Sequence, residues 1–199
     1  MNSPKGDPMI QELLQQNRSY RRFHQNHPIA EETLHQLIDL TRYTPSALNR
    51  QSLRYVISCD EKKNSTIFPS LGWAGYLKEW NGPAEGERPT AYIVILGDRT
   101  LNHDSRWGDH TVAAHTILLG ATEKGLGGCI IGNINKKKLT ETLNLSPDHE
   151  ILLVVALGKP NETVIIEPVD ETGSIRYWHD EEGNHHVPKR SLTDLILDK

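Results

Sequence analysis

Three arginines and a serine stand close together in residues 18–22 (RSYRR), near the start of the chain. A guanidinium presents a planar fork of N–H donors and the Ser19 hydroxyl adds another donor, a combination that suits a phosphate group. The alternative is a solvated basic turn whose cations favour the C-terminal end of a preceding helix. A second basic pair, Lys189 and Arg190, follows a proline far along the chain and allows the same two interpretations.

A polar loop occupies residues 45–51 (PSALNRQ), between a predicted helix and a predicted strand. The amides of Asn49 and Gln51 can donate and accept hydrogen bonds at once, as the edge of a heteroaromatic ring requires. Ser46 adds a hydroxyl to this set. Serine and asparagine also favour ordinary turns, where they bond the backbone. The segment is therefore either a ring-binding loop or a hydrogen-bonded turn.

Other kinds of active site have less support. Of the ten histidines, His110 and His115 share one predicted helix at a spacing that does not bring them together, and no ligand set accompanies them, so we expect no metal site. Cys59 and Cys129 lie in apolar strand patterns and should be structural and reduced. No serine stands in a G-x-S-x-G elbow, which disfavours a hydrolase of that type.

Residues 109–133 predict the centre of the fold. Residues 111–122 carry no charge and leave no clear polar face, so we expect a helix that is buried on all sides, with Asp109 capping it or favouring its positive end. Residues 127–128 are glycines, and residues 129–131 predict a short buried strand. A Rossmann fingerprint has the reverse order, strand before glycines and helix after, which favours a packed helix-to-strand joint here.

The remaining pattern alternates helices and strands, which predicts a mixed α and β class with a modest sheet packed by helices. We expect helices at about residues 10–17 and 28–41, a short aromatic helix at 73–80 and a helix capped by Asn135. The expected strands are residues 55–59, 92–96 and 151–157. A charged arm begins at residue 160 and carries a hairpin (174–179 and 183–187) and an amphipathic tail.

Composition narrows the classes further. The 199 residues fit one ordinary domain, and the net charge of −4 argues against general nucleic-acid binding. No apolar stretch is long enough to span a bilayer, and the first residues lack a basic start followed by an apolar run. We therefore expect a cytoplasmic protein that does not bind membranes.

Taken together, these motifs resemble the nitroreductase family of FMN-dependent flavoproteins. NRSYRRF is similar to the family's phosphate motif, TPSALNRQ to its Ser-x-x-Asn-x-Gln flavin loop, residues 109–132 to its core helix and glycine strand, and LGKP with VPKRSL to its closing elements. The resemblance covers residues 1–199 as a single FMN-binding domain. It implies an α+β fold of three layers, with a central mixed, mostly antiparallel sheet between helices and a C-terminal arm (about 160–199) that embraces a partner subunit.

The resemblance also implies a site for FMN. The FMN phosphate and ribityl chain would contact Arg18, Ser19, Tyr20 and Arg21, together with Lys189 and Arg190 of the arm. The loop that meets the flavin from the partner subunit would supply Pro45, Ser46, Ala47, Asn49 and Gln51. The flavin ring would lie along Ile131, Gly132 and Asn133. Family members usually follow the loop glutamine with Pro-Trp or Pro-Leu, whereas Ser52 and Leu53 stand here. Larger members also carry a longer insertion where residues 60–89 are compact.

The implied activity is an FMN-dependent oxidoreductase that takes hydride from NAD(P)H and reduces small electrophiles such as nitroaromatics or quinones by a ping-pong mechanism. The implied assembly is a homodimer with FMN at the interface, and no side chain is expected to act as a catalytic acid or base. Three alternatives stay open: a non-catalytic FMN-binding module, a dehalogenating or flavin-fragmenting member of the same fold, and a domain that binds another phosphorylated ligand.

Overall fold

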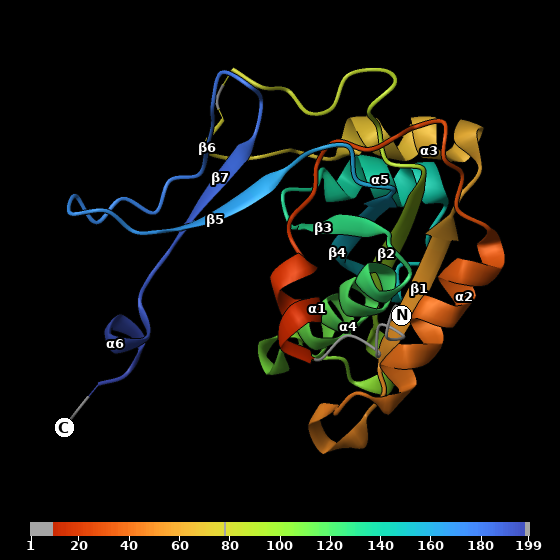
Figure 1. Cartoon of the computed structure of the whole chain (residues 1–199). Helices are drawn as coiled ribbons and strands as arrows, with labels where there is room; N and C mark the ends of the chain where they lie inside the picture. The colour runs from red at the N-terminus through yellow and green to blue at the C-terminus, as the bar shows by residue number, and fades with distance from the viewer. Residues whose placement is uncertain (1–9, 78, 198–199) are drawn as a thin grey trace, which may run out of the picture.

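A four-stranded antiparallel sheet lies at the centre of the computed structural model, which describes residues 10–77 and 79–197. Its strands are β1 (Leu53–Ser58), β2 (Ala91–Asp98), β3 (Gly127–Ile131) and β4 (His149–Gly158), in the order β1-β2-β4-β3. Every residue of β2 is buried, and β4 is buried along most of its length (Figure 1). The continuous apolar run at residues 151–157 is thus the central strand that its composition predicts.

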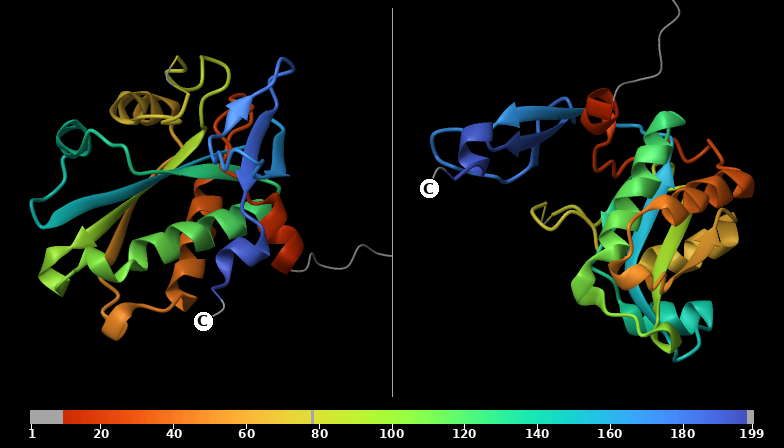
Figure 2. Two further views of the ribbon diagram at one scale, coloured as in Figure 1. Left: turned by 90° about the vertical axis from the view of Figure 1, so that its left-hand side faces the viewer. Right: turned by 90° about the horizontal axis from the view of Figure 1, so that it is seen from below.

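Helices cover both faces of this sheet. α2 (Glu31–Leu40) and α4 (Asp109–Glu123) pack one face, and α3 (Glu61–Ile67) and α5 (Lys136–Leu143) lie on the other (Figure 2). Asn135 caps α5 as predicted, since its side chain accepts a hydrogen bond from the Lys138 N–H at 3.1 Å. The three-layer α+β architecture is therefore confirmed.

Shorter elements connect these layers. In the described part of the chain they are α1 (Ile10–Gln16) and the 3₁₀ turns η1 (Thr41–Tyr43), η2 (Ala47–Asn49), η3 (Phe68–Ser70), η4 (Arg99–Leu101) and η5 (Ser105–Trp107). The prediction of an aromatic helix at residues 73–80 is wrong. Ala74 has a φ of +36° and turns replace the helix there, while α3 forms earlier, where Asp60 caps it by accepting a hydrogen bond from the Lys63 N–H at 2.8 Å.

Helix α4 begins and ends near the predicted limits but is not buried on all sides. Val112 is 41 % exposed, His115 is exposed and Leu119 is half-buried, so one stripe of the helix with these residues (the α4 stripe) is uncovered. Asp109 does not cap the helix, because Gly108 takes the N-cap position without a side-chain bond. The negative charge of Asp109 still lies in the first turn, where the helix dipole favours it.

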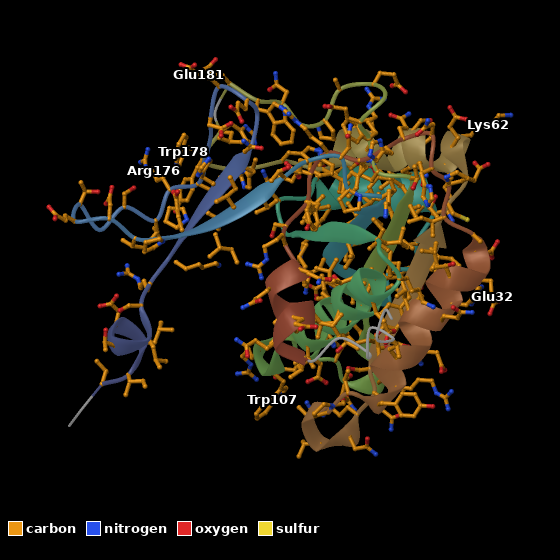
Figure 3. All side chains as sticks on the ribbon, in the orientation of Figure 1. Glu32, Lys62, Trp107, Arg176, Trp178 and Glu181 are labelled. Atoms are coloured by element: carbon orange, nitrogen blue, oxygen red, sulfur yellow. The ribbon has the colours of Figure 1, made fainter. Side chains whose placement is uncertain are left out.

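The C-terminal arm, of which residues 160–197 are described, carries a second sheet beside the core (Figures 1 and 3). Its strands are β5 (Val164–Pro168), β6 (Trp178–His179) and β7 (His185–Lys189), followed by α6 (Leu192–Leu195). β7 pairs parallel with β5 and antiparallel with β6, so the predicted hairpin is confirmed, although β6 is short.

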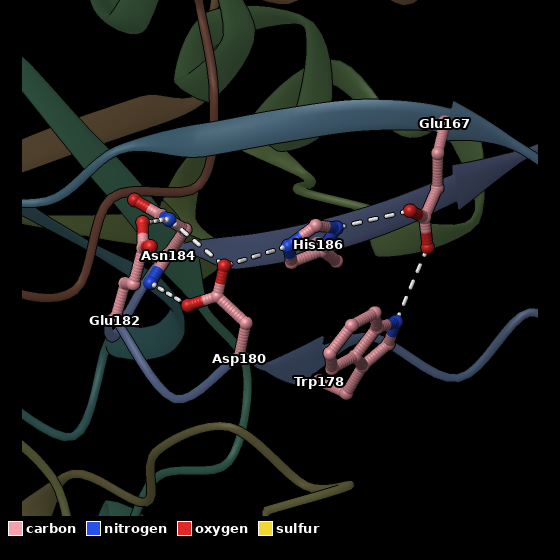
Figure 4. A network of polar contacts seen from close by, with 6 residues as sticks. All are labelled: Glu167, Trp178, Asp180, Glu182, Asn184 and His186. Atoms are coloured by element: carbon pink, nitrogen blue, oxygen red, sulfur yellow. Dashed lines mark hydrogen bonds and ion pairs between the residues drawn. The ribbon is translucent and has the colours of Figure 1, made fainter.

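Polar contacts hold the far side of the arm together (Figure 4). The ring of His186 lies between Glu167, with Nδ1 to Oε2 at 2.9 Å, and Asp180, with Nε2 to Oδ2 at 3.2 Å. Trp178 stacks on this ring with centroids 4.2 Å apart and donates its indole N–H to Glu167 at 3.1 Å. These two carboxylates raise the pKa of His186 above its ordinary value.

Candidate functional site

The RSYR segment (residues 18–21) follows α1 and lies against the start of β3. The Tyr20 N–H donates to the Gly128 carbonyl at 3.0 Å, and Ser19 forms a parallel bridge with Gly128. A Cβ on Gly127 would lie 2.5 Å from the Tyr20 ring. The glycines therefore let the segment approach the strand closely.

The guanidinium groups of Arg18 and Arg21 carry positive charge that the described residues do not neutralise. In residues 10–77 and 79–197 no carboxylate lies within ion-pair distance of either group, whereas Arg22 pairs with Glu87 at 3.7 Å. The Nε of Arg18 is buried without an acceptor in the same residues, although its Nη2 bonds the Leu14 carbonyl at the end of α1. This arrangement fits an anionic group such as phosphate, and it also contains the helix contact of the alternative interpretation.

The PSALNRQ loop (residues 45–51) is anchored to the first turn of α4. Asp109 accepts a hydrogen bond from the Ser46 hydroxyl at 2.7 Å and further bonds from the Ala47 N–H at 3.2 Å. The Ser46 hydroxyl in turn accepts from the Gln51 N–H at 3.0 Å. The local turn that serine favours is therefore present, and sequence reasoning missed that Asp109, 63 residues away, holds it.

Three residues of this loop have a strained, left-handed backbone. Leu48, Asn49 and Gln51 have φ values of +54°, +51° and +50°, a region that side chains other than glycine rarely adopt. The exposed amides of Asn49 and Gln51 bond each other at 3.1 Å. Such strain at an exposed polar loop is typical of a binding segment rather than of a plain connection.

Residues 131–133 leave the end of β3 beside a cavity of about 340 Å³. Ile131 is buried in the core, and Asn133 lines the cavity, where its carbonyl accepts a hydrogen bond from the Gly72 N–H at 2.8 Å. Trp73 and Trp80 also line this cavity. These two tryptophans were expected on the aromatic helix at residues 73–80, and the structure places them at this cavity without that helix.

The basic pair Lys189 and Arg190 lies at the end of β7, where both residues are exposed. No hydrogen bond or ion pair of the described structure joins either side chain to the RSYR segment. Other arm residues do reach this segment: Glu162 accepts a hydrogen bond from the Arg21 N–H, and His185 Nε2 lies 3.3 Å from Arg21 Nη1. A role for Lys189 and Arg190 at the phosphate stays a prediction.

Other candidate groups remain isolated. In the described part of the chain no three histidine, cysteine or carboxylate side chains gather at metal-binding distances. Cys59 and Cys129 are free thiols, and burial raises the pKa of Cys129 to about 12, which makes it a poor nucleophile. The described helices are also too short or too polar to cross a bilayer.

The candidate site is split between two separate regions of the molecule. Figure 1 shows the PSALNRQ loop, between α2 and β1, at one end of the core, and the arm sheet at the other. In Figure 3 Trp107, which ends η5 two residues before α4, lies at the same end of the core as that loop, whereas Trp178 lies on the arm. One copy of the chain therefore does not bring the polar loop to the RSYR segment.

Comparison with known proteins gives one consistent family. A model described as the nitroreductase family matches residues 14–75 and 80–159. YodC of Bacillus subtilis (strain 168), whose name proposes an NAD(P)H nitroreductase, is 22 % identical over 177 residues, covering 74 % of this chain and 88 % of YodC.

Solved structures show the same fold. A nitroreductase family protein from Streptococcus pneumoniae TIGR4 superposes with a TM-score of 0.68 at 16 % identity, over 96 % of this chain and all of the other. An FMN-dependent nitroreductase from Clostridium difficile R20291 gives 0.61 at 21 % identity, over 75 % and 87 %.

Proposed function

Because this chain belongs to the nitroreductase family, we propose that it is an FMN-dependent oxidoreductase that takes hydride from NAD(P)H and reduces small electrophiles such as nitroaromatics or quinones. The observation that carries the proposal is the RSYR segment against β3, with two guanidinium groups free of carboxylate partners in the described residues. FMN, when bound, supplies the electron transfer between the two substrates. The protein then has to position the substrates and exclude water, rather than supply an acid and a base.

The geometry supports several of the proposed contacts. Arg18, Ser19 and Arg21 would hold the phosphate through charge-assisted hydrogen bonds. Residues 131–133 would border the ring, and the adjoining cavity with Trp73 and Trp80 would admit a planar substrate. NAD(P)H and the oxidant would use this cavity in turn, which is the ping-pong order.

A homodimer would complete this site, because within one copy of the chain the PSALNRQ loop lies at the end of the core that is remote from the arm. Two uncovered apolar surfaces support that assembly. One is the α4 stripe with Val112, and the other is α6, where Leu192 is 70 % exposed and Leu195 67 %. Exposed leucines on a short helix far from the core would be buried if the arm packed on a second copy.

The visible absorption spectrum of the purified protein tests the activity. We expect a flavin spectrum that bleaches under anaerobic NADH or NADPH and recovers when a quinone or nitroaromatic is added. A spectrum that stays oxidised with both nucleotides would favour a binding module, and failure to bind added FMN would contradict the proposal. Treatment with a chelator should leave activity unchanged, because the proposed hydride transfer does not require a metal ion.

The Arg18→Ala/Arg21→Ala double variant tests the phosphate contacts. FMN retention should fall by at least about a hundredfold, because two charge-assisted contacts are removed.

Val112→Glu tests the dimer separately, since a charge on the α4 stripe should yield a monomer by light scattering. A double variant with unchanged flavin content, or a Val112→Glu dimer, would exclude the corresponding surface.

A further inference from the structure

The backbone of the RSYR segment is fastened to the first residues of the arm. The Oε1 of Glu162 accepts hydrogen bonds from the N–H groups of both Arg21 and Arg22, the second at 3.2 Å. The Asn161 N–H donates to the Arg22 carbonyl at 2.9 Å. One carboxylate therefore satisfies two consecutive backbone donors at the point where the core sheet passes into the arm.

This carboxylate leaves the arginine side chains available. Among the described residues no ion pair joins the Glu162 carboxylate to the guanidinium group of Arg21 or Arg22. Burial raises the pKa of Glu162, while the two backbone N–H bonds oppose that rise. The geometry is thus that of a backbone clamp rather than of a salt bridge.

The guanidinium of Arg21 is supported from the arm as well. Its Nη1 lies 3.3 Å from His185 Nε2 and 3.1 Å from the Ser19 carbonyl, and its Cζ lies 5.1 Å from the centre of the Tyr177 ring. His185 is 1 % exposed, and burial together with Arg21 lowers its pKa to about 4. A neutral imidazole can accept the Arg21 hydrogen bond without opposing its charge.

We propose that Glu162 and His185 are positioning residues for phosphate recognition: Glu162 fixes the backbone of the RSYR segment, and His185 fixes the direction of the Arg21 guanidinium. The inference rests on the proposed function, since it assumes that Arg21 binds the FMN phosphate. It makes recognition of the phosphate depend on the arm, which joins the segment from 141 residues away. Preorganised donors bind more tightly because less ordering remains to be done on binding.

The test compares two ligands that differ in the phosphate alone. FMN and riboflavin are titrated into flavin-free dimer, and the ratio of their dissociation constants gives the preference for the phosphate. Glu162→Ala should weaken FMN about tenfold and leave riboflavin within about twofold, because two backbone donors lose their acceptor. Glu162→Gln keeps an acceptor oxygen at the same place and should retain the wild-type preference.

Glu171→Ala is the matched control, since it removes the same charge from an exposed arm position outside these contacts. His185→Ala should lower the preference by several-fold and gives a second measurement should Glu162→Ala not fold. An unchanged preference for the phosphate in Glu162→Ala and His185→Ala would overturn the positioning role. Equal weakening of FMN and riboflavin binding in these variants would overturn it as well. Failure of the wild-type protein to bind either flavin would instead overturn the proposed function.

Discussion

The core and the arm of this chain are built on different principles. The core buries apolar side chains on both faces of its sheet, with Ile93, Ile95 and Val155 fully enclosed. Among the described arm residues, His185 alone is comparably buried, and stacking and hydrogen bonds around His186 hold the sheet. The core is therefore stabilised mainly by apolar burial, whereas the arm depends mainly on polar contacts.

The boundary between these regions coincides with the limit of the family match, which ends at residue 159. The RSYR segment lies at this boundary, since it bonds β3 on the core side and Glu162 on the arm side. The affinity for a cofactor bound at this segment would therefore depend on contacts from both regions. Substitutions that separate core stability from arm order can therefore test whether the division is real.

The largest expected effect comes from matched isoleucine substitutions in the two regions. Ile95→Ala removes a fully buried side chain from β2 and should lower the free energy of unfolding by about 3 kcal/mol, through lost burial and the cavity left behind. Ile166→Ala on β5, where the side chain is 44 % exposed, should lower it by less than about 1 kcal/mol. Urea denaturation followed by circular dichroism measures both values, and equal losses would mean that core and arm unfold as one unit.

Much of the core could be predicted from the sequence because its causes are local. Residues 151–157 form an unbroken apolar run, and Asn135 stands at the start of a helical pattern, so each predicts its own element. The error at α4 has a different origin. An apolar stripe requires a cover, but the pattern does not say whether the same chain or a second copy provides it.

The candidate site was only partly predictable for a related reason. The RSYR segment and the PSALNRQ loop have residue types that suit a ligand, and both were identified. Their supports, Glu162 and Asp109, are single carboxylates far away in sequence, and no spacing connects either with its loop. At residues 73–80 the helical spacing of the aromatic residues misled, because a left-handed Ala74 and turns interrupt the helix.

A smaller contrast is expected from the caps of two helices. Asn135→Ala removes the N-cap of α5 in the core and should lower the free energy of unfolding by about 1 kcal/mol. Ser191→Ala removes the equivalent cap of α6, where Ser191 and Asp194 form a capping box. The Ser191→Ala protein should keep the wild-type urea midpoint, since α6 lies on the arm, and a shift equal to that of Asn135→Ala would contradict an independently folding core.

The smallest effect should be a pH dependence confined to the arm. His186 has a raised pKa because Glu167 and Asp180 bond its ring, so its proton stabilises the folded arm. That stabilisation is fully present below the ordinary histidine value of 6.5 and is lost as pH rises through the raised value of the folded state. The carboxylates impose no loss in this window, since the pKa of Glu167 is lowered and that of Asp180 falls to about 2.

Hydrogen exchange, corrected for the intrinsic effect of pH, should therefore show faster opening of residues 178–187 as the solution becomes alkaline. Residues 151–157 of β4 provide the control within the same sample, because apolar burial in the core does not titrate. His186→Gln keeps a polar side chain without the titrating ring and should make the arm's exchange independent of pH over this range. A parallel rise in both segments would instead mean that the arm transmits its loosening to the sheet, and the separation between polar arm and apolar core would fail.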